Sequence, residues 1–377
     1  MSFVGAQAFT DNLRWVESQL SAARDFVEET DPDALVALVV GGLSLLAAFG
    51  GFLLVSDLTA VPFVLFVAAT GYGWVYHQEL TARAVSLAMT IVSILVLGLI
   101  LVFIFIEAWP VFQYASGTVL GVSVPGLQLF TAFEWSPVSG KVYSLVPMIH
   151  GTVMVTLVAT AVAGPLGVAA ALFISEIAPK TVRELVKPGV EILAGIPSIV
   201  YGFIGFTVLS PWASEQFGIV GQGTYLFVGV VVGLMALPTV VSVAEDALAS
   251  VPESMKSGSL ALGTTDWQTM TTITLPAAFS GVSAAVLLGV GRAIGETMAA
   301  TVMLRNSPQF PEPLYNAFYG YETLTSLIAA NYGEADGFQL SALFAAGVVL
   351  FITVLFLSVG SQLIERRMER KLGGESG

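Results

Sequence analysis

The sequence has no cysteine and only two histidines, His77 and His150, among its 377 residues. The missing thiols exclude disulfide bonds and thiolate metal ligands. Two histidines are also too few for a histidine-based metal site. We therefore expect no metal and no cofactor in this chain.

Charged side chains are scarce. They make up 11% of the residues, against about 25% in an average soluble domain. Hydrophobic residues account for 55%, and the mean hydropathy is +0.84. Apolar runs of membrane-spanning length recur along the chain without the period-2 alternation of a barrel. The composition predicts an all-α polytopic membrane protein.

Lysine is rare too. The chain has five lysines and nine arginines against 27 acidic residues, which gives a formal net charge of −13. This sign disfavours binding to nucleic acid. An acidic, lysine-poor exterior suits a protein that meets high salt, so we interpret it as indicating a halophilic source. An ordinary acidic membrane protein is the alternative. The first thirty residues lack the basic start and apolar core of a signal peptide.

About eight transmembrane helices are expected, because each apolar run approaches the roughly 20 residues that a bilayer requires. Eleven Lys and Arg residues fall between the runs on the side of the N-terminus and two on the other side, which predicts cytoplasmic termini. The runs are 34–55, 58–76, 84–106, 148–177, 189–209, 225–243, 277–304 and 340–363. Pro197 is expected to kink the fifth.

Nothing in the sequence supports a catalytic site. No Gly-x-x-x-x-Gly-Lys-Ser/Thr loop is present, so the chain does not hydrolyse ATP by the P-loop route. The glycine-rich stretch 289–295 has the wrong spacing for a dinucleotide motif and follows no strand. We expect a protein that is not an enzyme by itself.

A polar segment, 245–274, separates the sixth and seventh runs. Its spacing predicts a short helix, a turn at Gly263 and a second short helix. Pro276 is expected to begin the next membrane helix, where its missing N–H costs nothing. The residues that form the pattern are Ser257, Gly258, Ser259, Gly263, Ile273, Leu275 and Pro276.

Two opposite charges, Arg292 and Glu296, interrupt the seventh run. Four residues apart, they would share one helix face, although a charge at the bilayer centre costs roughly 2.5–3.5 kcal/mol. One interpretation is an ion pair that packs helices. The other is a polar patch on a translocation path, where arginine offers a planar fork to an oxyanion. Glu296 would then hold the arginine, limit the residence of the anion, or accept its proton.

These motifs resemble a known family. The polar segment is similar to the coupling loop of binding-protein-dependent ABC importer permeases, with Ser257-Gly258-Ser259 in place of its opening Glu-Ala-Ala. The stretch 292–299, RAIGETMA, resembles the signature of the C-type (PstC) phosphate permease. Three further segments agree: LAGIPSIVYG at 193–202, EWSP at 134–137 and AALFISEIAP at 170–179.

The resemblance implies a permease subunit of an ATP-driven importer of inorganic phosphate, working by alternating access in the cell membrane. Arg292 and Glu296 would line the phosphate path, and the coupling loop would contact the ATPase. The implied partners are a second permease (PstA type), two ATPase subunits (PstB type) that use ATP and Mg²⁺, and an extracellular phosphate-binding protein (PstS type). Sulfate, molybdate or phosphonate is the alternative substrate, and a solitary anion transporter or channel the alternative class.

The implied organisation places two additional helices before a six-helix core. Its segments are an acidic cytoplasmic lead, 1–33; the additional helices, 34–83; a first core helix with a long external loop, 84–146; a permease transmembrane domain, 147–365, with a cytoplasmic coupling loop at 245–275; and a basic cytoplasmic tail, 366–377.

Overall fold

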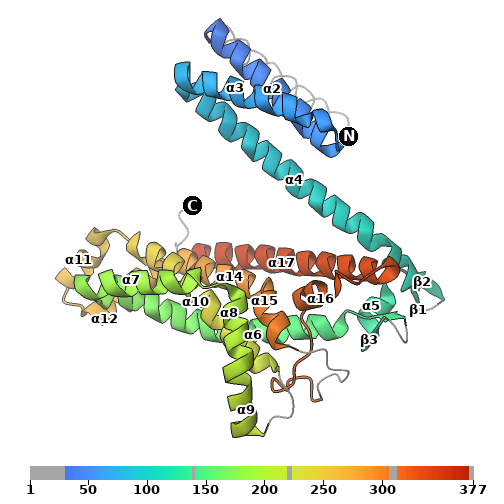
Figure 1. Cartoon of the computed structure of the whole chain (residues 1–377). Helices are drawn as coiled ribbons and strands as arrows, with labels where there is room; N and C mark the ends of the chain where they lie inside the picture. Colours follow the sequence, from blue (N-terminus) through green and yellow to red (C-terminus); the bar gives the residue numbers. More distant parts are fainter. Residues whose placement is uncertain (1–29, 120, 138–140, 219–222, 305–311, 373–377) are drawn as a thin grey trace, which may run out of the picture. The chain divides into compact units, whose positions relative to one another are not determined.

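The computed structural model describes residues 30–119, 121–137, 141–218, 223–304 and 312–372. Most of the expected acidic lead, and the last five residues of the expected tail, lie outside these ranges. The chain forms two compact units, residues 1–102 and 103–377, whose boundary falls inside helix α4 (Figure 1).

The first unit is a set of apolar helices. It holds α2 (Pro32–Leu53), the 3₁₀ turn η1 (Asp57–Thr59), α3 (Ala60–Tyr76) and the first part of α4 (Gln78–Tyr114). Ser56 caps η1, because its hydroxyl accepts a hydrogen bond from the Leu58 amide at 3.3 Å. Large apolar side chains such as Leu43 and Phe63 are exposed, as expected of surfaces that face lipid.

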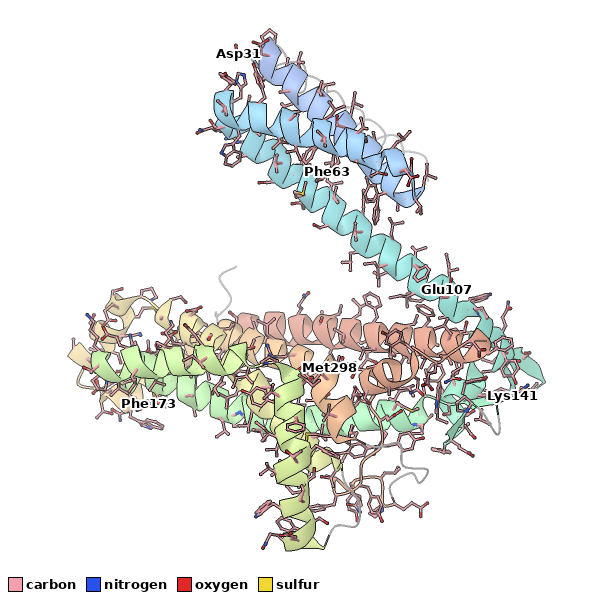
Figure 2. The ribbon with its side chains drawn as sticks, in the orientation of Figure 1. Asp31, Phe63, Glu107, Lys141, Phe173 and Met298 are labelled. Atoms are coloured by element: carbon pink, nitrogen blue, oxygen red, sulfur yellow. The ribbon has the colours of Figure 1, made fainter. Side chains whose placement is uncertain are left out.

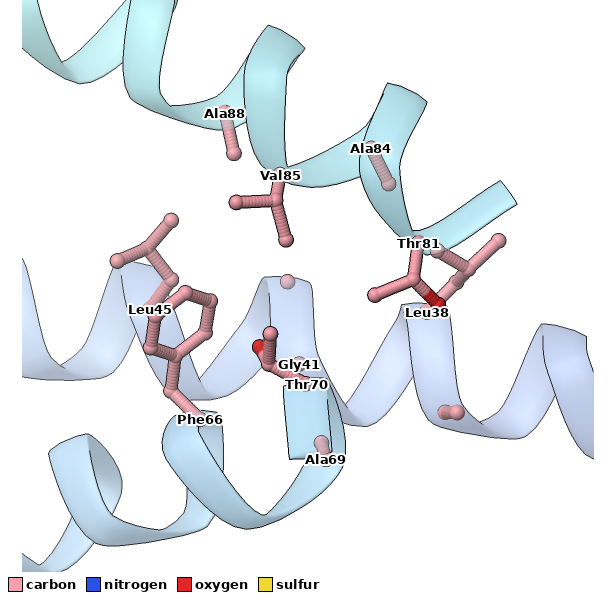
Figure 3. Close-up of a pocket in the computed structure, with 12 residues that line it drawn as sticks. Leu38, Gly41, Leu45, Phe66, Ala69, Thr70, Thr81, Ala84, Val85 and Ala88 are labelled. Atoms are coloured by element: carbon pink, nitrogen blue, oxygen red, sulfur yellow. The ribbon is translucent and has the colours of Figure 1, made fainter. Parts of the chain in front are cut away.

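A small cavity of about 80 Å³ lies among the three helices of this unit (Figure 3). Its walls are alanine, glycine, leucine, valine and phenylalanine, with Thr70 and Thr81 as the polar exceptions. The lining carries no charge. We interpret the cavity as a gap in helix packing between small residues.

The second unit is built on three long helices. They are α6 (Val146–Leu172), α10 (Tyr225–Ala249) and α14 (Phe279–Ile294), which pack against one another. α10 is the most enclosed candidate span of the described chain, because 61% of its most apolar stretch is buried. Small buried residues such as Ala159, Ala163 and Ala236 line the contacts, and they allow helix backbones to approach closely.

Further elements surround these three helices (Figure 1). They are β1 (Gly117–Val119), β2 (Val122–Val124), α5 (Leu127–Thr131), β3 (Trp135–Ser136), β4 (Val142–Tyr143), η2 (Phe173–Ile177), α7 (Lys180–Gly195), α8 (Ser198–Ile204), η3 (Gly205–Leu209), α9 (Ser210–Phe217), α11 (Glu253–Ala261), α12 (Asp266–Thr269), η4 (Met270–Thr274), α13 (Leu275–Ala277), α15 (Met298–Met303), α16 (Leu324–Asn331) and α17 (Gly337–Leu372). The η2, η3 and η4 segments are π-helical turns.

Six described helices are long and apolar enough to cross a membrane, or up to eight if each of two bent pairs counts as one span. One bent pair, Lys180–Gly195 with Ser198–Phe217, turns by 88° at Pro197. The predicted kink at Pro197 is therefore confirmed. The structure is a mostly helical, multi-span membrane protein, as predicted.

The third run is longer than expected. We predicted 84–106, whereas α4 extends over Gln78–Tyr114 with Pro110 inside it. Val111 and Ala108 are fully buried in the core of the second unit. Tertiary packing therefore continues the helix through residues that hydropathy assigns to a loop.

The described residues of the segment that follows α4 form two small antiparallel strand pairs, which the sequence did not predict. In the second, Trp135 pairs with Tyr143, and their rings meet edge to face at 5.9 Å. Trp135 is 6% exposed and belongs to the core. This residue therefore supports the fold of the segment and is not an exposed interfacial aromatic.

Candidate functional site

The seventh run is not one continuous helix. α14 ends at Ile294, residues 295–297 are non-helical, and α15 begins at Met298. The other bent pair lies upstream, where Asp266–Ala277 and Phe279–Ile294 meet at 72°. The prediction that Arg292 and Glu296 share one helix face is therefore wrong: Arg292 lies in the last turn of α14 and Glu296 in the break.

Glu296 is held by the helix that follows it. Its carboxylate Oε1 accepts a hydrogen bond from the Ala299 amide at 3.0 Å, in the first turn of α15. Its carbonyl oxygen accepts a hydrogen bond from the Thr325 hydroxyl at 2.7 Å, which joins the break to α16. A carboxylate at a helix N-terminus satisfies an orphan N–H and complements the helix dipole.

Arg292 has no carboxylate partner within 4.0 Å among the residues that the structure describes. The helix-packing ion pair with Glu296 is therefore absent. The residue is exposed on the isolated chain. Tyr201 of α8 is close enough to interact electrostatically with its charge. Among the described residues, the site thus offers a guanidinium without a carboxylate partner, which suits an anion.

Close packing between α8 and α15 fixes the surroundings of the break. A Cβ built on Gly202 would lie 2.7 Å from the Ala299 Cα, so only glycine allows this approach. Met298, the first residue of α15, is labelled beside α8 in Figure 2. The Tyr201 hydroxyl donates to the Leu193 carbonyl at 3.0 Å. That hydrogen bond spans the turn at Pro197.

The polar segment has the predicted helix–turn–helix form. α11 ends near Leu262, Gly263 turns with φ +88°, and α12 follows. Thr265 and Gln268 form a capping box that starts α12, with hydrogen bonds of 3.3 and 2.9 Å. Gly263 suits the turn, because L side chains rarely adopt this conformation.

Three hydroxyls join the two short helices. Ser259 lies 2.8 Å from Thr264, Thr264 lies 2.9 Å from Thr269, and Thr269 donates to Ser259 at 3.1 Å. Ser259 and Thr269 are buried, whereas Ser257 and Gly258 are exposed. Of the three small residues singled out in the sequence, Ser259 is the one whose buried hydroxyl joins the two short helices.

The membrane helix begins later than expected. Pro276 lies in α13, which continues the helical stretch Asp266–Ala277, and Ile273 lies in the π turn before it. The bend comes at Ala278, and α14 starts at Phe279. The prediction that Pro276 begins this helix is wrong, because the polar segment carries its helical hydrogen bonds past the proline.

Two ion pairs near this segment were missed. Lys256 Nζ lies 2.7 Å from Glu176 Oε1, and Lys187 Nζ lies 2.5 Å from Glu245 Oε2. In the sequence, both lysines contributed only to the count of basic residues that predicts the membrane orientation. The available signal was the carboxylates Glu176 and Glu245 at the ends of apolar runs, which need partners when they are buried.

Among the described residues, Glu322 is the most buried carboxylate outside the candidate spans. It is 7% exposed, and its Oε2 has no hydrogen-bond partner among the described residues. Burial raises its pKa from 4.5 to about 7, since desolvation disfavours the charged form. It precedes Thr323, the capping residue of α16. The neighbouring Tyr321 has a pKa raised to about 12, again by burial.

Residues 163–370, more than half of the chain, match the model of the binding-protein-dependent transport system inner membrane component family. The chain belongs to this family. The matched region contains the break, both short helices of the polar segment and the ion pairs described above. The polar segment of this permease therefore lies within the matched region.

Several relatives of the permease are catalogued as phosphate transport proteins. It is 39% identical over 249 residues to the probable ABC transporter permease protein YqgH of Bacillus subtilis, covering 65% of this chain and 79% of the relative. It is 35% identical over 272 residues to the phosphate transport system permease protein PstC of Xylella fastidiosa, covering 67% and 82%. For PstC of Haemophilus influenzae the identity is 30% over 315 residues, covering 78% and 95%.

Solved permease structures share the fold. The bacterial alginate ABC transporter in complex with its alginate-bound periplasmic protein gives a TM-score of 0.54 at 16% identity, covering 78% of this chain and 98% of the other. The inward-facing MetNI methionine ABC transporter gives 0.50 at 20% identity, covering 62% and 100%. At these identities the likeness establishes the architecture only.

Proposed function

We propose that this chain is the PstC-type permease subunit of an ATP-driven importer of inorganic phosphate. The observation that carries the proposal is that the guanidinium of Arg292, at the end of α14 beside the break at residues 295–297, has no carboxylate partner among the described residues. The named function of the PstC relatives supports phosphate as the anion.

Arg292 binds phosphate transiently as the anion passes. A guanidinium offers paired N–H donors to two oxyanion oxygens. Glu296 maintains the start of α15 through the Ala299 amide. It thereby sets the geometry of the break beside Arg292 and does not neutralise the arginine.

The coupling loop, residues 245–275, transmits the motion of a separate ATPase that uses ATP and Mg²⁺. Leu262, in the turn after α11, and Trp267 of α12 are 87% and 66% exposed, and exposed apolar side chains of this kind suit a protein partner. The complete importer would contain a PstA-type permease, two PstB-type ATPases and an extracellular PstS-type phosphate-binding protein. Both termini would be cytoplasmic.

The test is labelled-anion uptake by the full complex in vesicles, with phosphate, sulfate and molybdate offered separately. Phosphate alone should be imported, in an ATP-dependent manner. Arg292→Ala should abolish uptake while the subunits still co-purify, and Arg292→Lys should restore it only partly, because lysine lacks the planar fork. Arg83→Ala, which removes an exposed arginine paired with Glu79 in the first unit, is the matched control. Wild-type uptake by Arg292→Ala would refute the proposal.

A different outcome identifies each alternative. Preferential uptake of sulfate or molybdate would keep the permease and change the substrate. Uptake without any ATPase subunit would indicate a solitary transporter.

A further inference from the structure

The coupling loop is tied to the end of α6 by a partly buried ion pair. Lys256 of α11 and Glu176 of η2 lie eighty positions apart in the sequence, and their side chains meet at 2.7 Å with 14% of each exposed. Ser175 donates to the same Glu176 oxygen at 2.9 Å. The pair lines a cavity of about 450 Å³ between η2, α11 and α12. Removing one partner would leave a poorly solvated charge.

The end of α6 is in turn tied to α7. Arg183 of α7 donates from Nε to the Ile174 carbonyl at 2.7 Å, and its terminal nitrogen donates to the Ser175 carbonyl. Both carbonyls belong to the π turn η2, between the Phe173 and Ile177 positions (Figure 2, Phe173 labelled). A movement of Glu176 therefore reaches α7 through Arg183.

The far end of α7 is tied to the candidate anion site. Leu193 accepts the hydrogen bond from the Tyr201 hydroxyl across the turn at Pro197. α8, which carries Tyr201, packs on α15 at Gly202. Tyr201 also interacts with the charge of Arg292. Hydrogen bonds thus link Lys256 to Tyr201, and the last step to Arg292 is electrostatic.

α7 itself has no buried residue along its 16 positions. Its attachments are polar: Arg183 to η2, and Lys187 to Glu245 of α10. A helix with no fully buried side chain can shift more easily when its end contacts shift, because fewer interlocked side chains have to repack. This distinguishes α7 from α10, which is largely enclosed.

We propose that α7 is the lever between the coupling loop and the anion site, and that the Lys256–Glu176 ion pair is the contact through which the loop moves it. The proposal rests on the proposed function, because it assumes that an ATPase moves the loop. It assigns Lys256, Glu176 and Arg183 as positioning residues, which act on Arg292 through α7 and do not touch the anion.

The test measures ATP hydrolysis and phosphate uptake together in the reconstituted complex. Lys256→Met and Glu176→Gln should each retain the ATPase subunit and its hydrolysis, while phosphate imported per ATP falls about fivefold or more. The exchange variant Lys256→Glu with Glu176→Lys should restore most of the ratio. Lys180→Met is the matched control, because Lys180 is a 91% exposed lysine on α7, 4.0 Å from Glu184, and its ratio should stay at the wild-type value.

The lever is refuted if Lys256→Met and Glu176→Gln keep the wild-type ratio, or if both lose the ATPase subunit, which would make the pair a docking element. Failure of the exchange variant to improve on the single variants would refute the ion pair as the contact. A wild-type complex that imports no phosphate would instead refute the proposed function, so the two failures are distinguishable.

Discussion

The carboxylate of Glu296 accepts a hydrogen bond from the Ala299 amide at 3.0 Å and does not pair with Arg292. The two charges that look like partners in the sequence therefore have separate tasks. Glu296 satisfies the first turn of α15, and Arg292 keeps a guanidinium available beside the break.

This separation predicts different effects for two substitutions of Glu296. Glu296→Gln retains an oxygen acceptor and should keep the thermal stability close to wild type. Glu296→Ala removes the acceptor and should lower the free energy of unfolding by about 1 kcal/mol, as loss of a helix cap does. Thermal unfolding of the purified complex measures both.

Uptake by Glu296→Gln then decides how the residue contributes. If positioning is its task, phosphate uptake by this variant should stay within about twofold of wild type. Complete loss of uptake in a stable Glu296→Gln protein would contradict that assignment and would require the negative charge itself.

Local signals predicted the features that local physics controls. A proline beyond the first turn weakens a helix, and the chain turns by 88° at the break that contains Pro197, where the sequence predicts a kink. Gly263 within a polar segment predicted the turn between two short helices. Its φ of +88° explains why glycine occupies this position. The apolar runs likewise located the long helices within a few residues at most ends.

Features that depend on distant partners could not be predicted. Nothing in the composition of run 277–304 marks a break at residues 295–297, which are held by Thr325 and Ala299. The Lys256–Glu176 pair joins segments eighty residues apart, so it cannot be predicted from the spacing of residues within one helix. The hairpin of Trp135 is stabilised by burial against the core, which hydropathy alone does not reveal.

Gly263→Ala should strain the turn of the coupling loop. An alanine at φ +88° costs roughly 1–2 kcal/mol, although no atom lies within 4 Å of its Cβ. We expect weaker retention of the ATPase subunit on co-purification. Gly258→Ala is the control, because Gly258 lies in α11 with equally open surroundings and alanine favours a helix. Equal retention by both variants would show that the turn does not affect docking.

Gly202→Ala should separate α8 from α15. The new methyl carbon would lie 2.7 Å from the Ala299 Cα, which is backbone and has to shift. Overpacking of this kind costs about 1–3 kcal/mol, and the shift would displace Tyr201 from Arg292. We expect a lower melting temperature and reduced phosphate uptake. Gly189→Ala, at an open position on α7, should leave both unchanged, and the same behaviour at Gly202 would argue against tight α8–α15 packing.

Glu322 predicts a pH dependence of stability. Its pKa is raised in the folded protein from 4.5 to about 7 by burial, so the folded state binds more protons than the unfolded state between these values. Stability from this residue is therefore fully present below about pH 4.5 and is lost as the pH rises through about 7. The loss amounts to no more than about 3 kcal/mol.

Glu322→Gln isolates this contribution. Glutamine keeps the shape of the protonated carboxyl group and cannot ionise, so the melting temperature of this variant should fall less between pH 5 and pH 8 than that of wild type. Glu334→Gln, at an exposed position of the same external segment, should retain the wild-type pH profile. If Glu322→Gln and wild type lose stability in parallel over this range, the carboxyl group is already ionised in the folded protein. The shape of α16 and its Thr323 cap would then have to be maintained around a buried negative charge.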